Sequence, residues 1–264
     1  MPKACEGRVA IVTGASRGIG EAIARRLAGE GARVAISART MEPDPRYSGS
    51  LVETAEAIRE AGGEAVPIRC DLSSSDDRRN LVAETQARLG PVDILVNNAA
   101  VTYLLPLEEF TRKRFDLMVE VQLWAPYELA QLVVPGMKER GEGWILNVSS
   151  RAANQAPGPP FDEVHKGGFT VYGTMKAGLD RMSNAMAAEL YDHGIAVNAL
   201  APWDNVATPG AGHHELVEGF ALEGVEWMAE AALVLCSSSP KQLTGRVAYS
   251  QPLLDELEIV PRRQ

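Results

Sequence analysis

The sequence is poor in cysteine and histidine, with three and four residues among 264. Cys5, Cys70 and Cys236 form no Cys-x-x-Cys pair, and the adjacent His213 and His214 would point in different directions on a helix. No third ligand is evident beside that histidine pair. We therefore predict that the chain holds no metal and that its thiols are reduced, as in a cytoplasmic protein.

Positive charge and long apolar runs are also scarce. The 26 Lys and Arg residues face 35 Asp and Glu, which gives a net charge of −9. This is the opposite of the basic footprint of a protein that binds nucleic acid or an anionic membrane. No apolar run approaches the roughly 20 residues that span a bilayer, and "MPKACEGRVAIVTG" lacks a secretory signal pattern. We expect a soluble, cytoplasmic protein in which a local device holds any anionic ligand.

What the chain does contain is a regular alternation of short apolar runs and helix-length amphipathic segments. The runs are β-branched and mostly apolar throughout, as in strands covered on both faces. The alternation predicts an α/β fold: a single Rossmann-type domain over residues 1–264, with a doubly wound parallel seven-stranded sheet and helices on both faces. We expect strands at 8–13, 32–37, 64–70, 92–97, 143–149, 195–200 and 246–250, and helices at 18–29, 50–61, 75–89, 107–123, 124–140, 171–192 and 224–237.

A glycine-rich segment, "VTGASRGIGEAIARRLAGEGARV", joins the first strand to the first helix. Glycines at its turn allow the chain to reverse, to approach a pyrophosphate and to pack the helix closely on the sheet. The helix N-terminus adds N–H groups and the positive end of its dipole. A turn without ligand is the alternative, but the strand–turn–helix context favours a phosphate loop. Its predicted cofactor-binding residues are Gly14, Ser16, Arg17, Gly18, Ile19 and Gly20.

The end of the second strand indicates which dinucleotide is bound. An acidic residue there would bond the ribose 2′-hydroxyl and repel a 2′-phosphate, but "ISART" has no acid before Glu42. Arg39 follows the strand and Arg17 lies in the glycine loop, so that two guanidiniums are placed to hold a phosphate. We predict that NADP(H) is preferred; with Arg39 solvated, NAD(H) is possible as well.

Six motifs occur in the order "TGASRGIG", "CDLS", "NNAA", "NVSS", "YGTMK" and "VNALAP". With them the chain resembles the short-chain dehydrogenase/reductase family over nearly its whole length, and within it the hydroxysteroid-dehydrogenase-like branch. The resemblance implies that Asp71 and Leu72 contact the adenine and that Asn98 lines the cofactor and steadies the central strands. It also implies cofactor contacts at the nicotinamide end from Pro202, the Val206 backbone and Thr208.

The resemblance further implies that Tyr172 is the general acid/base, Lys176 its electrostatic partner and Ser150 the hydroxyl that polarises the carbonyl. A free phenol has a pKa near ~10, too high for a base at neutral pH. Lys176 lies one helical turn on, and its charge favours the phenolate, as would an oxidised nicotinamide nearby. Lys176 should also donate to the cofactor ribose. Ser149 is the alternative to Ser150, because alternation lets only one of the two face the cofactor.

The chain departs from the family pattern at several positions. Gln122 stands where relatives carry an asparagine that organises a water relay with the lysine; it either replaces that residue in catalysis or is an ordinary polar helix residue. Ala100 and Trp203 stand where glycine is usual, and Trp203 is either a wall of the substrate pocket or a packing residue. The interval of 22 residues from Ser150 to Tyr172 is long, and we expect the loop 154–169 to lie over the site.

These features predict an oxidoreductase that transfers a hydride between NADP(H) and a carbonyl or alcohol group of a moderately apolar small molecule. We expect residues 203–220 to cover the substrate and the helices at 107–140 to join copies into a homo-oligomer, a dimer or a tetramer. Two alternatives are a cofactor-using isomerase or dehydratase, and a catalytically decayed sensor or scaffold that binds NADP(H) without consuming it. The sequence does not identify the substrate.

Overall fold

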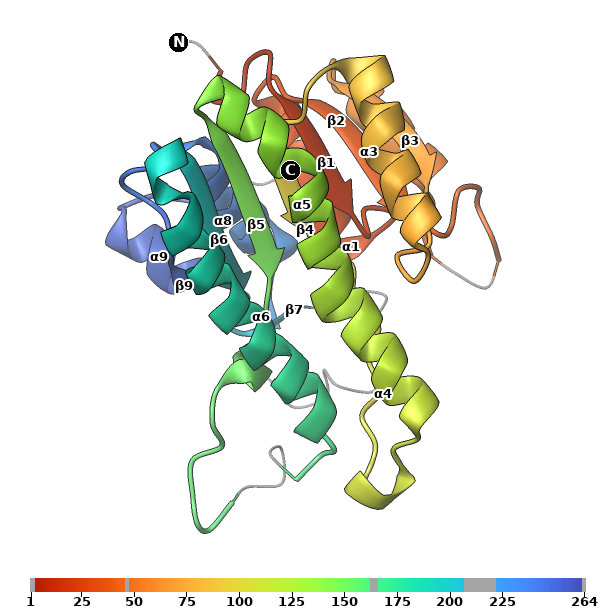
Figure 1. Cartoon of the computed structure of the whole chain (residues 1–264), viewed down its shortest axis with the longest axis vertical. Helices are drawn as coiled ribbons and strands as arrows, with labels where there is room; N and C mark the ends of the chain where they lie inside the picture. The colour runs from red at the N-terminus through yellow and green to blue at the C-terminus, as the bar shows by residue number, and fades with distance from the viewer. Residues whose placement is uncertain (1–2, 46–47, 162–165, 207–221, 263–264) are drawn as a thin grey trace.

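A seven-stranded parallel sheet organises the chain, with strand order β3-β2-β1-β4-β5-β6-β9 (Figure 1). The computed structural model describes residues 3–45, 48–161, 166–206 and 222–262. Each of the six strand pairs in this sheet is parallel. The order reverses between β1 and β4, which is where doubly wound sheets open a ligand crevice. The predicted α/β fold with seven parallel strands is confirmed.

The strands form where the sequence has its short apolar runs. Every residue of β1, β4, β5 and β6 is buried, because helices cover both faces of the sheet. The strands are β1 Val9–Thr13, β2 Arg33–Ala38, β3 Glu64–Arg69, β4 Ile94–Asn97, β5 Gly143–Val148, β6 Ile195–Ala201 and β9 Val247–Tyr249. These bounds lie within two residues of the predicted ones.

Two layers of helices enclose the sheet (Figure 1). One face is covered by α1 (Gly18–Gly29), α2 (Leu51–Glu60), α8 (Val225–Ser237) and α9 (Ser250–Glu256), whose apolar residues form one core cluster with the sheet. The other face is covered by α3 (Ser75–Leu89), α5 (Ala125–Arg140) and α6 (Thr170–Leu190). Side chains cap several helices: Ser50 Oγ accepts from the N–H of Glu53 and Ser74 Oγ from that of Asp77.

The region predicted as two helices, 107–123 and 124–140, is built differently. Residues Leu107–Glu109 form a short 3₁₀ turn, and α4 (Arg112–Val119) begins only after Thr111, which caps it. The helix then runs through a π-helical turn, Glu120–Trp124, directly into α5. The predicted start and the predicted break were therefore wrong. The widened turn matters for function because π turns often occur at functional sites, and this one contains Gln122.

Three short elements escaped prediction. Strands β7 (Asn205–Val206) and β8 (Leu222–Glu223) pair in a separate two-stranded sheet, and helix α9 follows β9. Two-residue strands carry no periodic signal.

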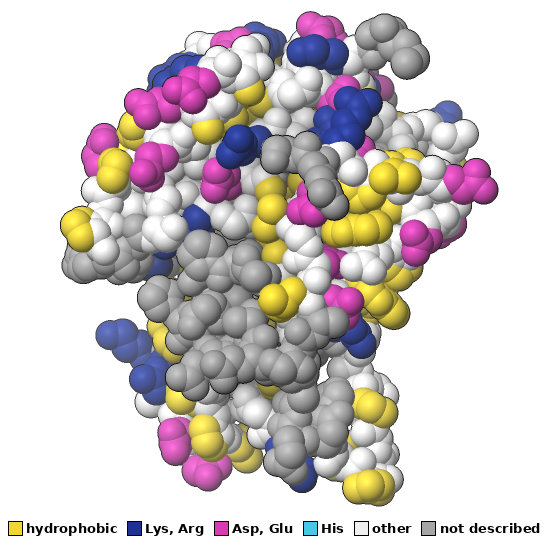
Figure 2. Space-filling view, turned by 180° about the vertical axis from the view of Figure 1, so that it is seen from behind, with side chains coloured by type: hydrophobic (Ala, Val, Ile, Leu, Met, Phe, Trp, Pro, Cys, Tyr) yellow, Lys and Arg dark blue, Asp and Glu magenta, His cyan; other side chains and the backbone are white. Residues whose placement is uncertain are grey.

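Within the described residues, no helix combines the length and apolar character needed to cross a bilayer. On the face shown in Figure 2, basic and acidic side chains are interspersed rather than gathered into a basic patch.

Candidate active site

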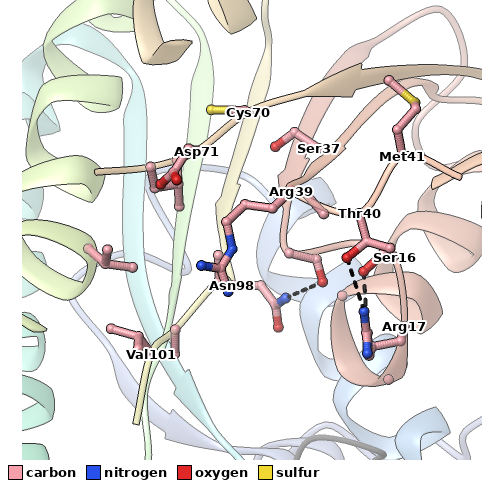
Figure 3. Close-up of a pocket in the computed structure, with 18 of the residues that line it drawn as sticks. Ser16, Arg17, Ser37, Arg39, Thr40, Met41, Cys70, Asp71, Asn98 and Val101 are labelled. Atoms are coloured by element: carbon pink, nitrogen blue, oxygen red, sulfur yellow. Dashed lines mark hydrogen bonds between the residues drawn. The ribbon is translucent and has the colours of Figure 1, made fainter. Parts of the chain in front are cut away.

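A cleft of about 1090 Å³ opens at the C-terminal ends of β1, β2, β3 and β4, at the reversal of strand order (Figure 3). Among its lining residues are the predicted Gly14, Ser16, Arg17, Gly18, Ile19, Gly20, Arg39, Asp71, Leu72 and Asn98. Residues that follow β4 or lie on α4 and the π turn close one side: Ala99, Ala100, Val101, Leu117 and Val121. The fold thus brings together segments that the sequence places as far apart as positions 14 and 121.

The glycine loop has the close packing that its predicted role requires. Gly14 and Gly18 adopt positive φ angles of 66° and 60°. A Cβ on Gly14 would lie 2.8 Å from the Cα of Ala99, and one on Gly20 would overlap the side-chain nitrogen of Asn98. Asn98 Nδ2 donates to the Thr13 carbonyl at 2.9 Å and to that of Gly14 at 3.2 Å, which ties the end of β4 to that of β1. The absence of a side chain at either glycine therefore lets the loop and the start of α1 pack closely on the end of β4.

The two predicted arginines both line the cleft. Arg39 extends into it from the end of β2, near Asp71, whereas Arg17 lies on the α1 side with its Nη2 3.4 Å from Thr40 Oγ1 (Figure 3). Glu42 and Asp44 also belong to the lining. The cleft therefore offers a 2′-phosphate two guanidiniums, but it places acidic groups in the same region.

Asp71 stands charged at the end of β3. Burial raises the pKa of its carboxyl group, but hydrogen bonds from the Ser73 N–H and hydroxyl and the charges of Arg39 and Arg69 outweigh burial and leave the pKa below its usual value. The two Ser73 bonds measure 3.0 and 2.8 Å. A fixed carboxylate in the cleft wall is suited to accept a hydrogen bond from an adenine amino group.

Tyr172, Lys176 and Ser150 come together as predicted. Tyr172 and Lys176 lie one turn apart on α6, with Lys176 Nζ 5.8 Å from the centre of the Tyr172 ring. Ser150, two residues after the end of β5, lies beside Tyr172 and acts to lower the pKa of its phenol. The preceding residue, Ser149, is 4% exposed and faces Asp180 on α6 instead. The geometry thus favours Ser150 over Ser149 as the partner of the tyrosine.

Burial acts on the protonation of both Tyr172 and Lys176. Burial raises the pKa of Tyr172, and the group that opposes this rise is Ser150 rather than Lys176. Burial also lowers the pKa of Lys176 to about 8, against the charge of Asp180. The expectation that the charge of Lys176 and an oxidised nicotinamide together make the phenol more acidic concerns the enzyme with its cofactor, and it stays a prediction. Burial disfavours both charged forms, and Lys176 Nζ is directed at the carbonyl oxygen of Val148, 2.8 Å away.

Gln122 points into the protein from the π turn and is 1% exposed. Its Nε2 donates to the Val101 carbonyl at 2.8 Å, which holds the π turn against the segment that lines the cleft. Within the described part of the chain, its Oε1 is buried without a partner. Internal waters commonly satisfy such acceptors, so that this geometry is compatible with a water relay at Gln122.

The nicotinamide end is described only in part. Pro202 and Val206 follow β6, Val206 being buried in β7, while Thr208, His213 and His214 lie outside the described residues. Trp203 packs edge-on against Tyr249, with ring centres 5.8 Å apart, and Arg151 lies over its ring at 4.9 Å. The Trp203 N–H donates to Ser250 Oγ at 2.9 Å. Trp203 is thus fixed beside the segment that follows Ser150.

Comparison with known proteins assigns the family. The sequence profile described as short chain dehydrogenase matches residues 8–213. The chain belongs to this family. A curated relative is the ketoacyl reductase HetN of Nostoc sp., which is 30% identical over 95% of this chain and 82% of its own length. Hydroxysteroid dehydrogenase-like protein 2 of Danio rerio is 32% identical over 94% of this chain, but the match spans only 58% of that protein.

A solved structure of a metagenomic short-chain oxidoreductase in complex with NADP is 31% identical to this short chain dehydrogenase. The two superimpose with a TM-score of 0.75, and the match covers 94% of this chain and 99% of the other. These relatives are named as dehydrogenases, reductases or oxidoreductases. The chain is accordingly an enzyme of the oxidoreductase type acting on CH–OH groups.

Sequence reasoning missed several residues that shape the site of this short chain dehydrogenase. Asp180 continues the face of Tyr172 and Lys176 by one more turn, and its spacing of four from Lys176 was a usable signal. Arg78 and Glu223 gave no such signal, because each becomes buried only through contacts far apart in the sequence.

Proposed function

We propose that this protein interconverts a carbonyl and an alcohol on a moderately apolar small molecule, with NADP(H) as the preferred cofactor and NAD(H) as a possible one. The observation that carries the proposal is the convergence of three side chains: Ser150 lies beside the Tyr172 phenol, and Lys176 lies one helical turn away with its Nζ 5.8 Å from the centre of the Tyr172 ring. A decayed sensor would have no reason to keep all three groups in this arrangement.

Each side chain has a definite task. In reduction, Tyr172 donates its phenolic proton to the substrate oxygen; in oxidation, the phenolate accepts the proton of the alcohol. Ser150 donates to the oxygen on which negative charge develops. Lys176 holds positive charge near the phenol and donates to the cofactor ribose. When bound, NADP(H) supplies or accepts the hydride.

The preference for NADP(H) rests on Arg39 and Arg17 in the cleft lining. Guanidiniums bind phosphate through paired, charge-assisted hydrogen bonds. Glu42 and Asp44 in the same lining would repel a 2′-phosphate. We therefore propose that the phosphate lies closer to Arg39 than to these two carboxylates. The NADP complex of a 31% identical relative adds support.

The substrate class follows from the apolar groups around the site. Trp203 and Tyr249 form an aromatic pair next to the segment after Ser150, with ring centres 5.8 Å apart. These surfaces favour a moderately apolar carbonyl compound over a highly charged one.

We also propose that copies of the chain associate through α4 and α5. Phe115 on α4, Trp124 at the end of the π turn and Tyr127 on α5 are large, aromatic and exposed, and the last two rings lie with their centres 5.8 Å apart. Such a surface on helices of a folded protein favours a protein contact. Light scattering after gel filtration tests this, and a monomer at micromolar concentration would contradict it.

The test of the function is consumption of NADPH with a panel of ketones and aldehydes, run in parallel with NADH. The proposal predicts turnover with at least one carbonyl compound and a lower KM for NADPH than for NADH. Binding of NADPH without consumption by any of them would favour the sensor instead, and a lower KM for NADH would overturn the cofactor preference.

A further inference from the structure

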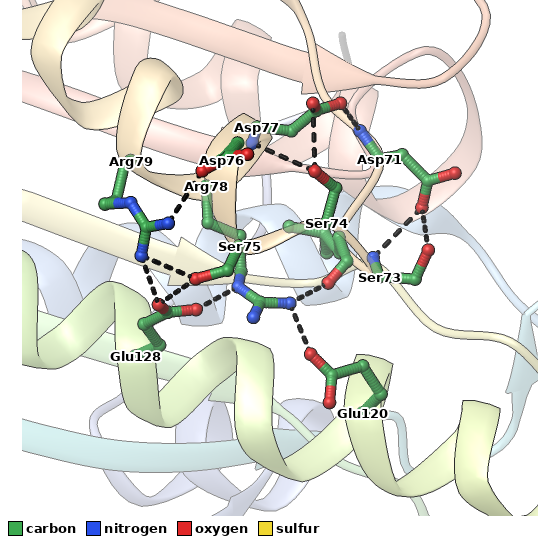
Figure 4. A network of polar contacts seen from close by, with 11 residues as sticks. Asp71, Ser73, Ser74, Ser75, Asp76, Asp77, Arg78, Arg79, Glu120 and Glu128 are labelled. Carbon is green, nitrogen blue, oxygen red and sulfur yellow. Dashed lines mark hydrogen bonds and ion pairs between the residues drawn. The ribbon is translucent and has the colours of Figure 1, made fainter.

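Arg78 on α3 has a side chain that is 1% exposed although it carries a full charge. Its Nε donates to Glu128 on α5 (Figure 4). Its Nη1 donates to the Leu72 carbonyl and to Glu120, the latter at 2.7 Å. The guanidinium thus connects three segments: the loop after β3, the π turn and α5.

The position of this guanidinium is strongly fixed. An arginine remains charged at any relevant pH, and burying it is costly unless its N–H groups find partners. Two carboxylates and a backbone carbonyl meet this need here. Because removal of a partner would leave a buried charge unpaired, the three segments hold one another in place.

Two of the three partners of Arg78 connect it to walls of the cofactor cleft. Leu72 lines the cleft beside Asp71, in the loop predicted to contact the adenine. Glu120 opens the π turn, whose next residue, Val121, lines the cleft from the other wall.

The loop itself is held at its other side by the start of α3. The Asp71 N–H donates to Asp77 Oδ2 at 2.8 Å, and Ser74 Oγ caps the helix by accepting from the Asp77 N–H at 3.2 Å (Figure 4). These bonds fix the loop to α3 alone. Arg78 carries the restraint onward to the π turn and α5.

We propose that Arg78 is a positioning residue for the adenine end of the cleft. By holding the Leu72 carbonyl and Glu120 together, it sets the separation of the two walls and thereby the affinity for the adenosine half of NADP(H). The inference rests on the proposed function, in which this cleft binds NADP(H).

The test is calorimetric titration with adenosine 2′,5′-bisphosphate, which carries the adenosine half and no nicotinamide. Arg78→Lys keeps the charge but cannot reach three acceptors in different directions. Because the loop and the π turn would no longer be held at one separation before binding, part of the binding free energy is spent on ordering them, and we expect the Kd of Arg78→Lys to rise about tenfold, which corresponds to ~1.4 kcal/mol. The same nucleotide measures binding without any dependence on turnover.

Arg79→Lys is the matched control. Arg79 is the neighbouring arginine of the same network; it contacts Asp76, Ser75 and Glu128 and, unlike Arg78, does not hold the Leu72 carbonyl (Figure 4). We expect the Kd of Arg79→Lys for the nucleotide to stay within about twofold of the wild-type value, because exposed ion pairs contribute little to holding a structure in place.

Calorimetry distinguishes the proposed positioning role of Arg78 from a purely structural role in folding. A structural role alone would lower the melting temperature and the binding stoichiometry of Arg78→Lys but leave the Kd of its folded fraction unchanged, and that result overturns the inference. If Arg78→Lys does not fold, Glu120→Gln serves instead: a smaller rise in Kd supports the inference and a wild-type Kd overturns it. Failure of the wild-type protein to bind the nucleotide would instead refute the proposed cofactor.

Discussion

Lys176 Nζ donates a hydrogen bond to the carbonyl oxygen of Val148, 2.8 Å away, and is thereby fixed at the end of β5. The residue is 3% exposed, and this acceptor is neutral. Among the described residues, the charged group that favours the ammonium form of Lys176 is Asp180, one helical turn further along α6. Tyr172 lies one turn before Lys176 on the same helix. The charge of Lys176 therefore depends on a carboxylate that has no predicted catalytic role.

Asp180→Asn is expected to lower the pKa of Lys176 below the value of about 8 that burial and Asp180 together set. The chain has six lysines, so that NMR titration of ¹³Cε-labelled lysine can follow Lys176, assigned with Lys176→Met. Glu189→Gln, which removes an equal charge from an exposed site on α6, is the control and should leave the pKa in place. An unchanged Lys176 pKa in Asp180→Asn would show that Asp180 does not set it.

The same burial gives folding stability a pH dependence. The pKa of Lys176 falls from 10.5 to about 8 on folding, so that between these values the unfolded chain binds more protons than the folded one. Stability contributed by this group then rises with pH across that window. Wild-type protein should gain stability relative to Lys176→Met between pH ~8 and ~10 in urea unfolding. A constant difference between the two would contradict the low pKa.

Gln122→Met is expected to lower the free energy of unfolding by about 1 kcal/mol, because the half-buried Val101 loses the donor to its carbonyl. Since Val101 also lines the cleft, KM for NADPH should rise as well. Gln131→Met on α5, where the glutamine is exposed, is the matched control and should change neither quantity. Equal unfolding curves for the two variants would show that the Val101 contact contributes nothing.

Arg39→Ala should raise KM for NADPH about tenfold through the loss of charge-assisted phosphate bonds, while KM for NADH stays the same. Arg69→Ala removes the same charge from the end of β3, where the side chain is largely exposed and lies outside the cleft lining. This control should leave both constants unchanged. Equal effects of Arg39→Ala on the two cofactors would mean that Arg39 does not recognise a 2′-phosphate.

The sequence was sufficient for the sheet and the glycine loop because both depend on local patterns. Apolar β-branched runs predict strands from their own residues. Gly14 and Gly20 are needed because a side chain at either position would collide with Asn98 or Ala99 at the end of β4. The Tyr172–Lys176 spacing likewise requires only that α6 be a helix.

What could not be predicted depends on tertiary contacts. The π turn inserts one residue into a helix and hardly changes its apolar pattern. Arg78 looks like a surface charge on α3 until Glu120 and Glu128 are brought to it from another helix. The raised pKa of Tyr172 comes from burial, which a spacing of four residues does not reveal.

The central claim, that Tyr172 exchanges the proton with the substrate, is tested most directly with Tyr172→Phe. The measurement is the rate of NADPH consumption with a carbonyl substrate that the wild-type protein reduces, alongside the Kd for NADPH. The account predicts that turnover is lost by roughly 10²-fold or more while the Kd for NADPH stays close to that of the wild type. Turnover near the wild-type rate would contradict it.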